Sequence, residues 1–380
     1  MRNNQKDSTG VIIGTCAIVF CLFAFLYIYC YQTPTLSYEQ HVLSGGVTFY
    51  HPLVSAIIIT VVAMMVQIIT FTITRLQGAS HALTYFPSMC LLAFLTCGQP
   101  DGNGGLTASG WIYVLPIALI LYPLLIKVIK QWISYPSMPE RFLFSRTLLA
   151  NLVMMIAFML LVVRIGNGDH LFHRQVWAEK LLIDKRYKEL AREGRGSSQI
   201  YRQTGITLFD KNIDNVVHPS TDSTLTLLRV IAMDKLGILA DSLFTQPVVA
   251  NTASLMQLEN IHPYLFPKQF LSRRKSTDYR LCSLLAGREL DKFAKLVSKH
   301  YNVNDSLAHD SIPRHYREAL VLYQHQRSNP VTAYKDPVLE TDYNDMKAQI
   351  KQCSSVKEKK FALWNNYRNT YWYYYFASTL

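Results

Sequence analysis

The chain has 380 residues and a formal net charge of +12, from 38 Lys and Arg residues against 26 Asp and Glu residues. Hydrophobic residues make up 50% of it, and every long apolar stretch lies within residues 1–166, which excludes a wholly water-soluble protein. In the second half the basic residues are interspersed with acidic ones, apart from two small clusters at residues 273–275 and 357–360. Such clusters are usually solvated, so we expect no nucleic-acid partner, and contact with anionic headgroups stays open as the alternative.

The apolar stretches predict the membrane-spanning helices. A helix that crosses a bilayer needs roughly 20 mostly apolar residues. The sequence predicts five spans, at residues 11–31, 53–74, 82–97, 111–129 and 147–165. The third is the shortest and contains Pro87, so a re-entrant segment or a buried hairpin stays open there, and with it a count of four spans. The first span is too long for a cleaved signal peptide, which favours an uncleaved anchor.

Lys and Arg in the short loops predict the orientation in the membrane. The N-terminus, Arg75 and the loop 130–146 are basic, whereas the loops 32–51 and 98–110 contain no Lys or Arg. With five spans, this alternation places the C-terminal half outside the cytoplasm. We therefore expect a multi-pass protein of the cell inner membrane, in contact with membrane lipids, with a periplasmic C-terminal domain.

Residues 167–380 have the period of amphipathic helices. The expected fold class is therefore all-α, a polytopic transmembrane bundle over residues 1–166 followed by a soluble α-helical domain over residues 167–380. The runs LRVIAMDKLGILADSLF and YRLCSLLAGRELDKFAKLV share one pattern, in which a glycine, Gly237 or Gly287, separates two short helices. Glycine readily takes the left-handed conformation that ends a helix. Such pairs are the unit of tetratricopeptide-like solenoids, although the full signature is absent.

An aromatic-rich tail closes the chain. Ser355 and Glu358 form a capping box, which predicts the start of one last helix. We expect this helix to cover the end of the helical stack, while a foot on the membrane interface and a sugar-binding platform stay open as alternatives. The tail residues with an expected structural or interaction role are Trp364, Tyr367, Tyr371, Trp372 and Tyr375.

Few residues indicate chemistry. The weak candidates in or beside the outer loops are His41, His51, Asp101, His170 and His173. His170 and His173 have a spacing that can ligate a metal, but no third ligand is evident, so we expect neither metal nor cofactor. We assign no catalytic residue, because no nucleophile or phosphate-binding motif is present. The acidic residues Glu340, Asp342 and Asp345 suit a helix N-terminus. Whether Cys282 and Cys353 form a disulfide stays open.

Three runs, LRVIAMDKLGILADSLF, IPRHYREALVLYQHQRSNP and NNYRNTYWYYYFAS, resemble an uncharacterised inner-membrane protein family of Bacteroidetes. That family has a multi-span N-terminal half and a tetratricopeptide-like helical domain with an aromatic-rich C-terminal tail. The resemblance implies architecture and source, not chemistry. We expect a scaffold or assembly factor that binds another envelope protein through its helical domain. The alternative is a membrane enzyme acting on lipid-linked sugars or cell-envelope glycans.

Overall fold

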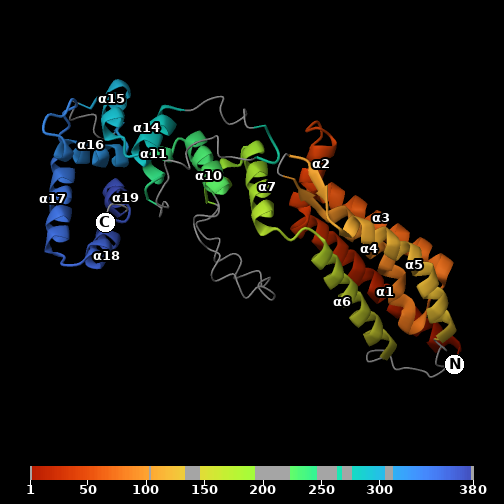
Figure 1. Cartoon of the computed structure of the whole chain (residues 1–380). Helices are drawn as coiled ribbons and strands as arrows, with labels where there is room; N and C mark the ends of the chain where they lie inside the picture. The colour runs from red at the N-terminus through yellow and green to blue at the C-terminus, as the bar shows by residue number, and fades with distance from the viewer. Residues whose placement is uncertain are drawn as a thin grey trace. The chain divides into compact units, whose positions relative to one another are not determined.

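The computed structural model describes residues 2–101, 104–132, 146–192, 223–245, 263–267, 276–303 and 311–377. The chain divides into two compact units, Met1–Val176 and Trp177–Leu380 (Figure 1). The division falls inside the helix α7 (His170–Ile183).

Five helical segments of the first unit are long and apolar enough to cross a membrane, as predicted. They are α1 (Arg2–Leu26) with the π-helical turn η1 (Tyr27–Tyr31), α3 (Pro52–Thr74), the 3₁₀ helix η2 (Gly78–Tyr85) with α4 (Phe86–Thr96), α5 (Trp111–Trp132), and α6 (Arg146–Ile165). The short third segment is long enough to reach across because a 3₁₀ helix rises about 2.0 Å per residue and an α-helix about 1.5 Å. Together, η2 and α4 extend about 30 Å, the thickness of the hydrocarbon core.

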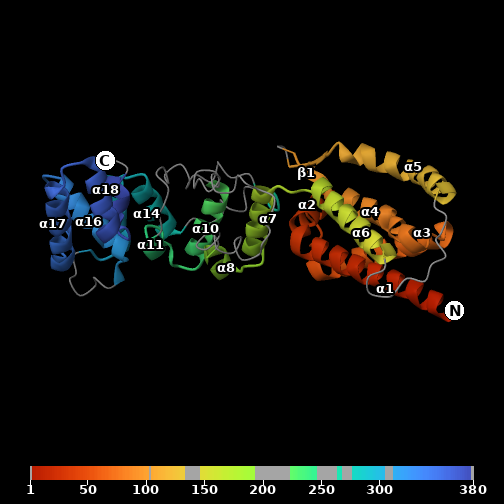
Figure 2. The same cartoon turned by 90° about the horizontal axis from the view of Figure 1, so that it is seen from below.

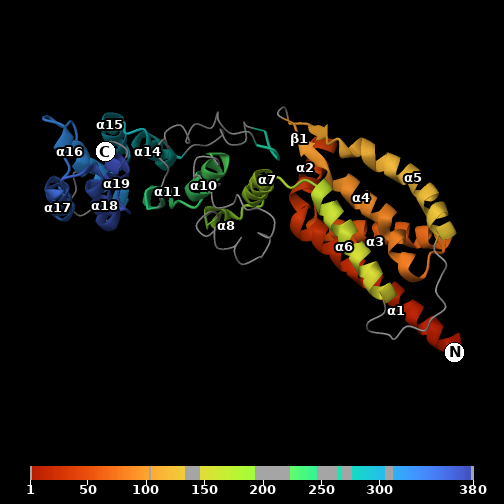
Figure 3. The ribbon, with the colours of Figure 1, turned by 60° about the horizontal axis from the view of Figure 1, so that its bottom comes forward.

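The helix α3 shows how these spans pack. Its buried residues are small or polar and recur along one face: Ala56, Ala63, Gln67, Thr70 and Thr74. Its large apolar residues are exposed instead, among them Ile57, Ile58, Ile68, Ile69 and Ile73. This is the reverse of a water-soluble helix, and it suits lipid outside and close helix packing inside. The helix α1 packs on α3 and α6, and α4 packs on α3, α5 and α6 (Figure 3).

Two polar side chains connect the spans, as their positions in otherwise apolar segments indicate. Gln67 donates from Nε2 to Oγ1 of Thr84 at 3.2 Å. Asn151 of α6 donates to the Gly78 carbonyl at 2.8 Å and accepts from the Ala82 amide at 2.7 Å. The Asn151 amide thereby satisfies backbone groups of η2 that have no water to bind within a membrane.

The loops on one side of the bundle contain structure that the sequence did not predict. The helix α2 (Thr33–Leu43) occupies most of the loop 32–51. The strands β1 (Gly98–Pro100) and β2 (Leu106–Ala108) form an antiparallel hairpin in which Gly98 pairs with Ala108 (Figure 2). The all-α expectation is therefore wrong in this detail, because a glycine-rich run that lacks hydrophobic periodicity can still pair as a hairpin.

The regular secondary structure of the second unit is entirely helical in its described residues. Beyond α7 its helices are α8 (Tyr187–Arg192), α10 (Ser223–Lys235), α11 (Leu239–Ser242), α14 (Thr277–Ala286), α15 (Leu290–His300), α16 (Arg314–Gln326), α17 (Pro337–Gln352), α18 (Val356–Tyr367) and α19 (Tyr371–Ala377). Helices that follow one another pack together from α14 to α19, and α19 also returns to α16. The acidic residue Glu340 lies in the first turn of α17, whose N-cap is Asp336.

One turn geometry occurs three times in this unit. Lys185, Gly237 and Arg288 all have left-handed backbones, with φ of 58°, 71° and 57°. Each follows the first helix of a pair, and its amide donates to the carbonyl three residues earlier. The next amide donates to a carbonyl five residues back, which completes a Schellman motif. At Lys185 this turn joins the helices α7 and α8.

For Gly287 the expected turn is confirmed, but the expected left-handed conformation is wrong. A turn does separate α14 from α15, but Gly287 itself has φ of −78° and ψ of −4°, and Arg288 carries the left-handed conformation. Aligning the two runs from Leu228 and Tyr279 places Arg288, not Gly287, opposite Gly237. The hydrogen-bonded turn thus imposes its geometry on an arginine where a glycine would be strain-free.

These glycines give a matched pair of substitutions. We expect Gly237→Ala to lower the free energy of unfolding by about 1 kcal/mol, from left-handed strain alone. No heavy atom lies within 4 Å of the added Cβ. In contrast, Gly287→Ala should leave stability unchanged, since its Cβ would be in ordinary contact, 3.4 Å from the Ser283 carbonyl oxygen. Urea unfolding of both variants in detergent measures the difference, and equal losses would contradict the assignment.

Candidate functional site

Polar side chains gather at the hairpin end of the membrane bundle, where the first, third and fifth spans finish. We call this the hairpin-end cluster, and its members are Tyr27, Gln32, Thr35, Thr96, Asn167 and His173. Tyr27 Oη lies 2.9 Å from Thr96 Oγ1. Gln32 donates from Nε2 to the Asn167 carbonyl at 3.0 Å, and the Asn167 amide donates to the Thr96 carbonyl at 2.7 Å. The contacts join chain segments that are far apart in sequence.

A π-helical turn positions the first members of the cluster. Over Tyr27–Tyr31 the backbone widens, and the Gln32 amide donates to the Tyr27 carbonyl at 2.9 Å. The extra residue in the turn changes which face the following side chains occupy. Such turns are rare and occur frequently at functional sites. The apolar sequence YIYCY carries no signal for this geometry.

Gly166 allows the segments to approach closely. A Cβ atom placed on Gly166 would lie 2.1 Å from Tyr27 Oη, 3.0 Å from Thr96 Oγ1 and 3.1 Å from Gln32 Nε2. The buried hydroxyl and amide groups hold one another in place, so they cannot move aside without losing hydrogen bonds. Only glycine fits at this position.

We therefore expect Gly166→Ala to destabilise the bundle by roughly 1–3 kcal/mol, the range for overpacking a filled site. Gly168→Ala is the matched control, because its Cβ would have a normal contact of 3.6 Å with Tyr31 Oη. Thermal unfolding of both variants in the same detergent gives the comparison. A Gly166→Ala protein as stable as Gly168→Ala would show that the cluster is loosely packed.

His173 is held in one protonation state by its neighbours. The Thr35 hydroxyl donates to Gln32 Oε1 at 2.8 Å and lies 3.1 Å from His173 Nε2. Because that hydroxyl has a single hydrogen, His173 donates from Nε2 and is the Nε2–H tautomer. Burial, together with the neighbouring His170, lowers the pKa of His173 to about 4. The imidazole is therefore neutral at physiological pH.

Glu39 is a functional candidate that the sequence analysis missed. It lies in α2, and burial raises its pKa to about 7, although it accepts a hydrogen bond from the Gly98 backbone. A Cβ on Gly98 would be 2.2 Å from Glu39 Oε1, so the carboxylate sits directly on the backbone where the hairpin begins. One signal was available, since Glu39 is the only acidic residue in the loop 32–51.

The other outer-loop candidates are dispersed. His41 lies in α2, against Gly46. His51 is exposed at the N-cap of α3, and Asp101 accepts a hydrogen bond from the Gly105 amide inside its own turn. His170 is exposed, whereas His173 is buried three residues later. Among the residues that the structure describes, no three His, Cys, Asp or Glu side chains form a group that could hold a metal ion.

In the second unit, the aromatic tail is joined to the preceding helices by its polar atoms. Tyr371 donates from Oη to the Leu285 carbonyl at 2.9 Å, and Tyr374 donates to the Ala286 carbonyl at 2.7 Å. These two carbonyls are the last of α14, and the Leu285 carbonyl also accepts from the Arg288 amide of the turn. Trp372 donates from Nε1 to the Glu318 carbonyl at 2.8 Å. We call this contact of α19 with α14 and α16 the tail lock.

A buried carboxylate completes the tail lock. Glu318 is fully buried in α16, and its Oε2 accepts from the Tyr371 amide at 2.7 Å, at the start of α19. His315 Nδ1 lies 2.9 Å from the same oxygen, and Arg314 donates from Nε to Oε1 at 2.8 Å. The carboxylate thus has several partners, as a buried charged group requires.

The tail differs from its prediction in one respect. It is two helices, and the Thr370 hydroxyl accepts from the Tyr373 amide at 3.2 Å to begin the second. This break rotates the aromatic faces. Tyr371 and Trp372 are fully buried, but Trp364 is 42% exposed, so Trp364 does not share their place in the core. Tyr367 and Tyr375 are half-buried. The rings of Tyr371 and Trp372 are therefore enclosed by the surrounding helices.

The two tryptophans provide a direct test of the tail lock. Trp372→Ala should lower the free energy of unfolding by about 3–5 kcal/mol, because a large buried ring and its hydrogen bond are lost. Trp364→Ala should cost less than about 1 kcal/mol, as is usual for an exposed position. Thermal unfolding and protein abundance in cells report both effects. Similar losses in the two variants would rule out a lock centred on Trp372.

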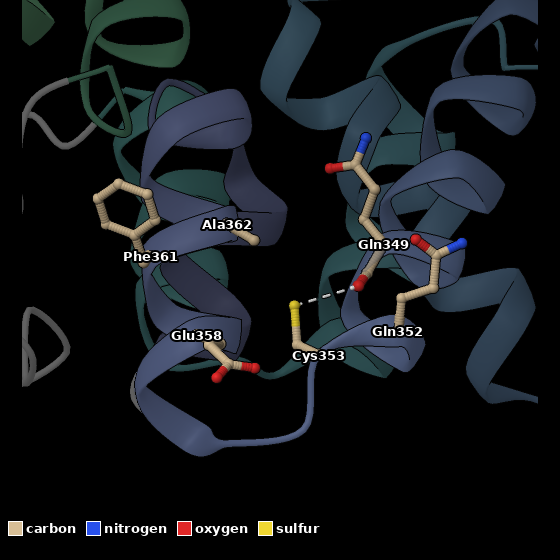
Figure 4. Close-up of a pocket in the computed structure, with 6 residues that line it drawn as sticks. All are labelled: Gln349, Gln352, Cys353, Glu358, Phe361 and Ala362. Carbon is tan, nitrogen blue, oxygen red and sulfur yellow. Dashed lines mark hydrogen bonds between the residues drawn. The ribbon is translucent and has the colours of Figure 1, made fainter.

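A cleft of about 380 Å³ lies between α17 and α18. Its lining residues are Gln349, Gln352, Cys353, Glu358, Phe361 and Ala362 (Figure 4). Two of these groups could take part in chemistry, the Cys353 thiol and the Glu358 carboxylate, but both already form hydrogen bonds at the helix ends. The Cys353 thiol donates to the Gln349 carbonyl at 3.3 Å, and Glu358 Oε2 accepts from the Ser354 amide at 2.9 Å. These backbone hydrogen bonds lower the pKa of Glu358. The predicted capping box is confirmed.

Cys282 and Cys353 are both free thiols. Cys282 is fully buried in α14, and burial raises the pKa of its thiol to about 12. A thiol that stays protonated is a poor nucleophile. Cys282 therefore behaves as a core residue.

These features define the class of protein. A bundle of five candidate spans followed by a helical unit makes the chain a multi-pass membrane protein. Its C-terminal region, residues 268–378, matches a family of unknown function, DUF6057. The matched region contains every residue of the tail lock, from Leu285 to Tyr374. No curated protein and no solved structure gave a significant match to the chain.

Proposed function

We propose that the protein is a scaffold or assembly factor of the cell envelope, whose tetratricopeptide-like helical domain binds another protein. The observation that supports this proposal best is the repeated helix pair with the same Schellman turn at Lys185, Gly237 and Arg288. Stacked helix pairs present long side-chain surfaces that suit protein recognition. The hydrogen bonds of the tail lock join helices within the C-terminal region, so they contribute to its internal packing.

Exposed apolar residues support a binding role for the helical domain. Val331 lies in the loop between α16 and α17 and is 76% exposed. Val338 lies in α17 and is 70% exposed. A photo-crosslinking amino acid at either position should give a discrete protein adduct in cells. The matched control is Ile73, which is 74% exposed on the membrane bundle and should give lipid adducts only. If positions 331 and 338 give no protein adduct, the scaffold proposal loses its support.

A second candidate function is a membrane enzyme acting on lipid-linked sugars or cell-envelope glycans. Glu39 is the observation that favours it, because a carboxyl group with a pKa of about 7 can exchange protons near neutral pH. Glu39→Gln separates the two proposals. Loss of function in cells, with unchanged stability and unchanged crosslinking at position 331, would favour the enzyme. An unaffected phenotype would favour the scaffold.

We further propose that the protein resides in the inner membrane with its C-terminal domain in the periplasm. The basic loops at Arg75 and 130–146 support this orientation, since Lys and Arg are retained on the cytoplasmic side. Alkaline phosphatase fused after Leu380 should be active, and a cytoplasm-restricted fluorescent protein at the same site should be dark. The reverse pattern would place the domain in the cytoplasm.

A further inference from the structure

The helix α18 is unusual in what it exposes. Leu363 is its one buried residue. Phe361 is 70% exposed and Trp364 is 42% exposed, although both are large and apolar. A helix that belongs only to a protein core would bury such side chains.

The exposed aromatic rings share one helical face with basic side chains. At helical spacing, Lys357, Lys360, Phe361, Trp364 and Arg368 recur on the same side, and we call this the α18 basic aromatic face. All five are exposed. The Arg368 guanidinium lies 6.0 Å from the centre of the Trp364 ring.

No acidic residue interrupts this face. Glu358, the acidic residue of α18 itself, is turned to the start of the helix, where it accepts from the Ser354 and Ser355 amides. Figure 4 shows the ring of Phe361 pointing away from Cys353, on the outer side of α18. The face therefore combines three cations with two exposed aromatic rings, and no acidic residue of α18 lies on it.

We propose that the α18 basic aromatic face binds an anionic phospholipid surface. Tryptophan favours the boundary between headgroups and acyl chains, and lysine and arginine are attracted to anionic lipids. A protein partner would be expected to hold the aromatic anchors in pockets and offer paired acids. Exposed cations beside exposed rings match the charge and the layered polarity of an anionic headgroup region, so a lipid surface fits the face better. The five spans keep the chain at a membrane, where such lipids are always present.

The test uses the full chain in nanodiscs of phosphatidylcholine. Flotation is measured with added vesicles of phosphatidylcholine, with or without phosphatidylglycerol. We expect the protein to float with the anionic vesicles only, and less at high salt, because exposed charges are screened. The triple variant Lys357→Gln, Lys360→Gln, Arg368→Gln should bind roughly a hundredfold more weakly, at about fivefold per basic residue.

Two further variants complete the design. The charge-matched control Lys235→Gln, Lys295→Gln, Lys299→Gln changes exposed residues of α10 and α15 and should float like the wild type. The double variant Phe361→Ser, Trp364→Ser should also lose binding, since the charges alone would not insert. All of these side chains are exposed, so unchanged thermal unfolding verifies the fold.

The proposal is wrong if the triple variant floats as well as the wild type, or if the control loses binding equally. It is also wrong if the wild type ignores anionic vesicles but forms adducts with a protein through a crosslinker at position 361. That last outcome would assign the face to the partner of the scaffold proposal. The lipid test is independent of that proposal, because crosslinking at positions 331 and 338 does not involve α18.

Discussion

Every helix end leaves backbone amides and carbonyls without partners inside the helix, and the structure depends on how distant side chains supply them. Within a membrane no water can do so, and each unsatisfied group costs several kcal/mol. Asn151 satisfies backbone groups of η2, and Gln32 reaches the Asn167 carbonyl where two spans end. The same need is met in the second unit by tyrosine hydroxyls on the last carbonyls of α14.

In the second unit, buried carboxylates hold together segments that are distant in sequence. Glu318 accepts from the Tyr371 amide and thereby fixes the start of α19. Glu179 is also fully buried, and its Oε2 accepts from the successive amides of Tyr264 and Leu265 at 2.8 and 2.7 Å. Removing one partner of a buried charge leaves that charge uncompensated, which costs about 3–5 kcal/mol. Each buried carboxylate therefore connects a short segment to a helix that is distant in sequence.

This use of polar residues bears on function. In the hairpin-end cluster, His173 is neutral and hydrogen-bonded, and its neighbours in the cluster bind one another. Glu39 is the exception, with its pKa near neutrality. In the second unit, by contrast, side chains suited to recognition are exposed at Val331, at Val338 and on the α18 basic aromatic face. Recognition of a protein and a lipid surface is consequently better supported than chemistry.

The sequence by itself determined the large-scale organisation of this protein. Twenty-residue apolar runs specify spans because the bilayer imposes a length, and helical periodicity specifies helices because one face must be buried. It also located the capping box at Ser355. These signals are local, or they follow from the solvent alone.

Only the tertiary structure decided which residues meet. Arg288 takes the left-handed conformation beside Gly287 because hydrogen bonds of the turn require it there. Trp364 is exposed and Trp372 is buried because a break at Thr370 turns α19 onto Glu318, an interaction between residues far apart in sequence. The close approach at Gly166 and the raised pKa of Glu39 likewise depend on partners from other helices. Composition and spacing carry no record of such long-range contacts, so they could not have been predicted from one sequence.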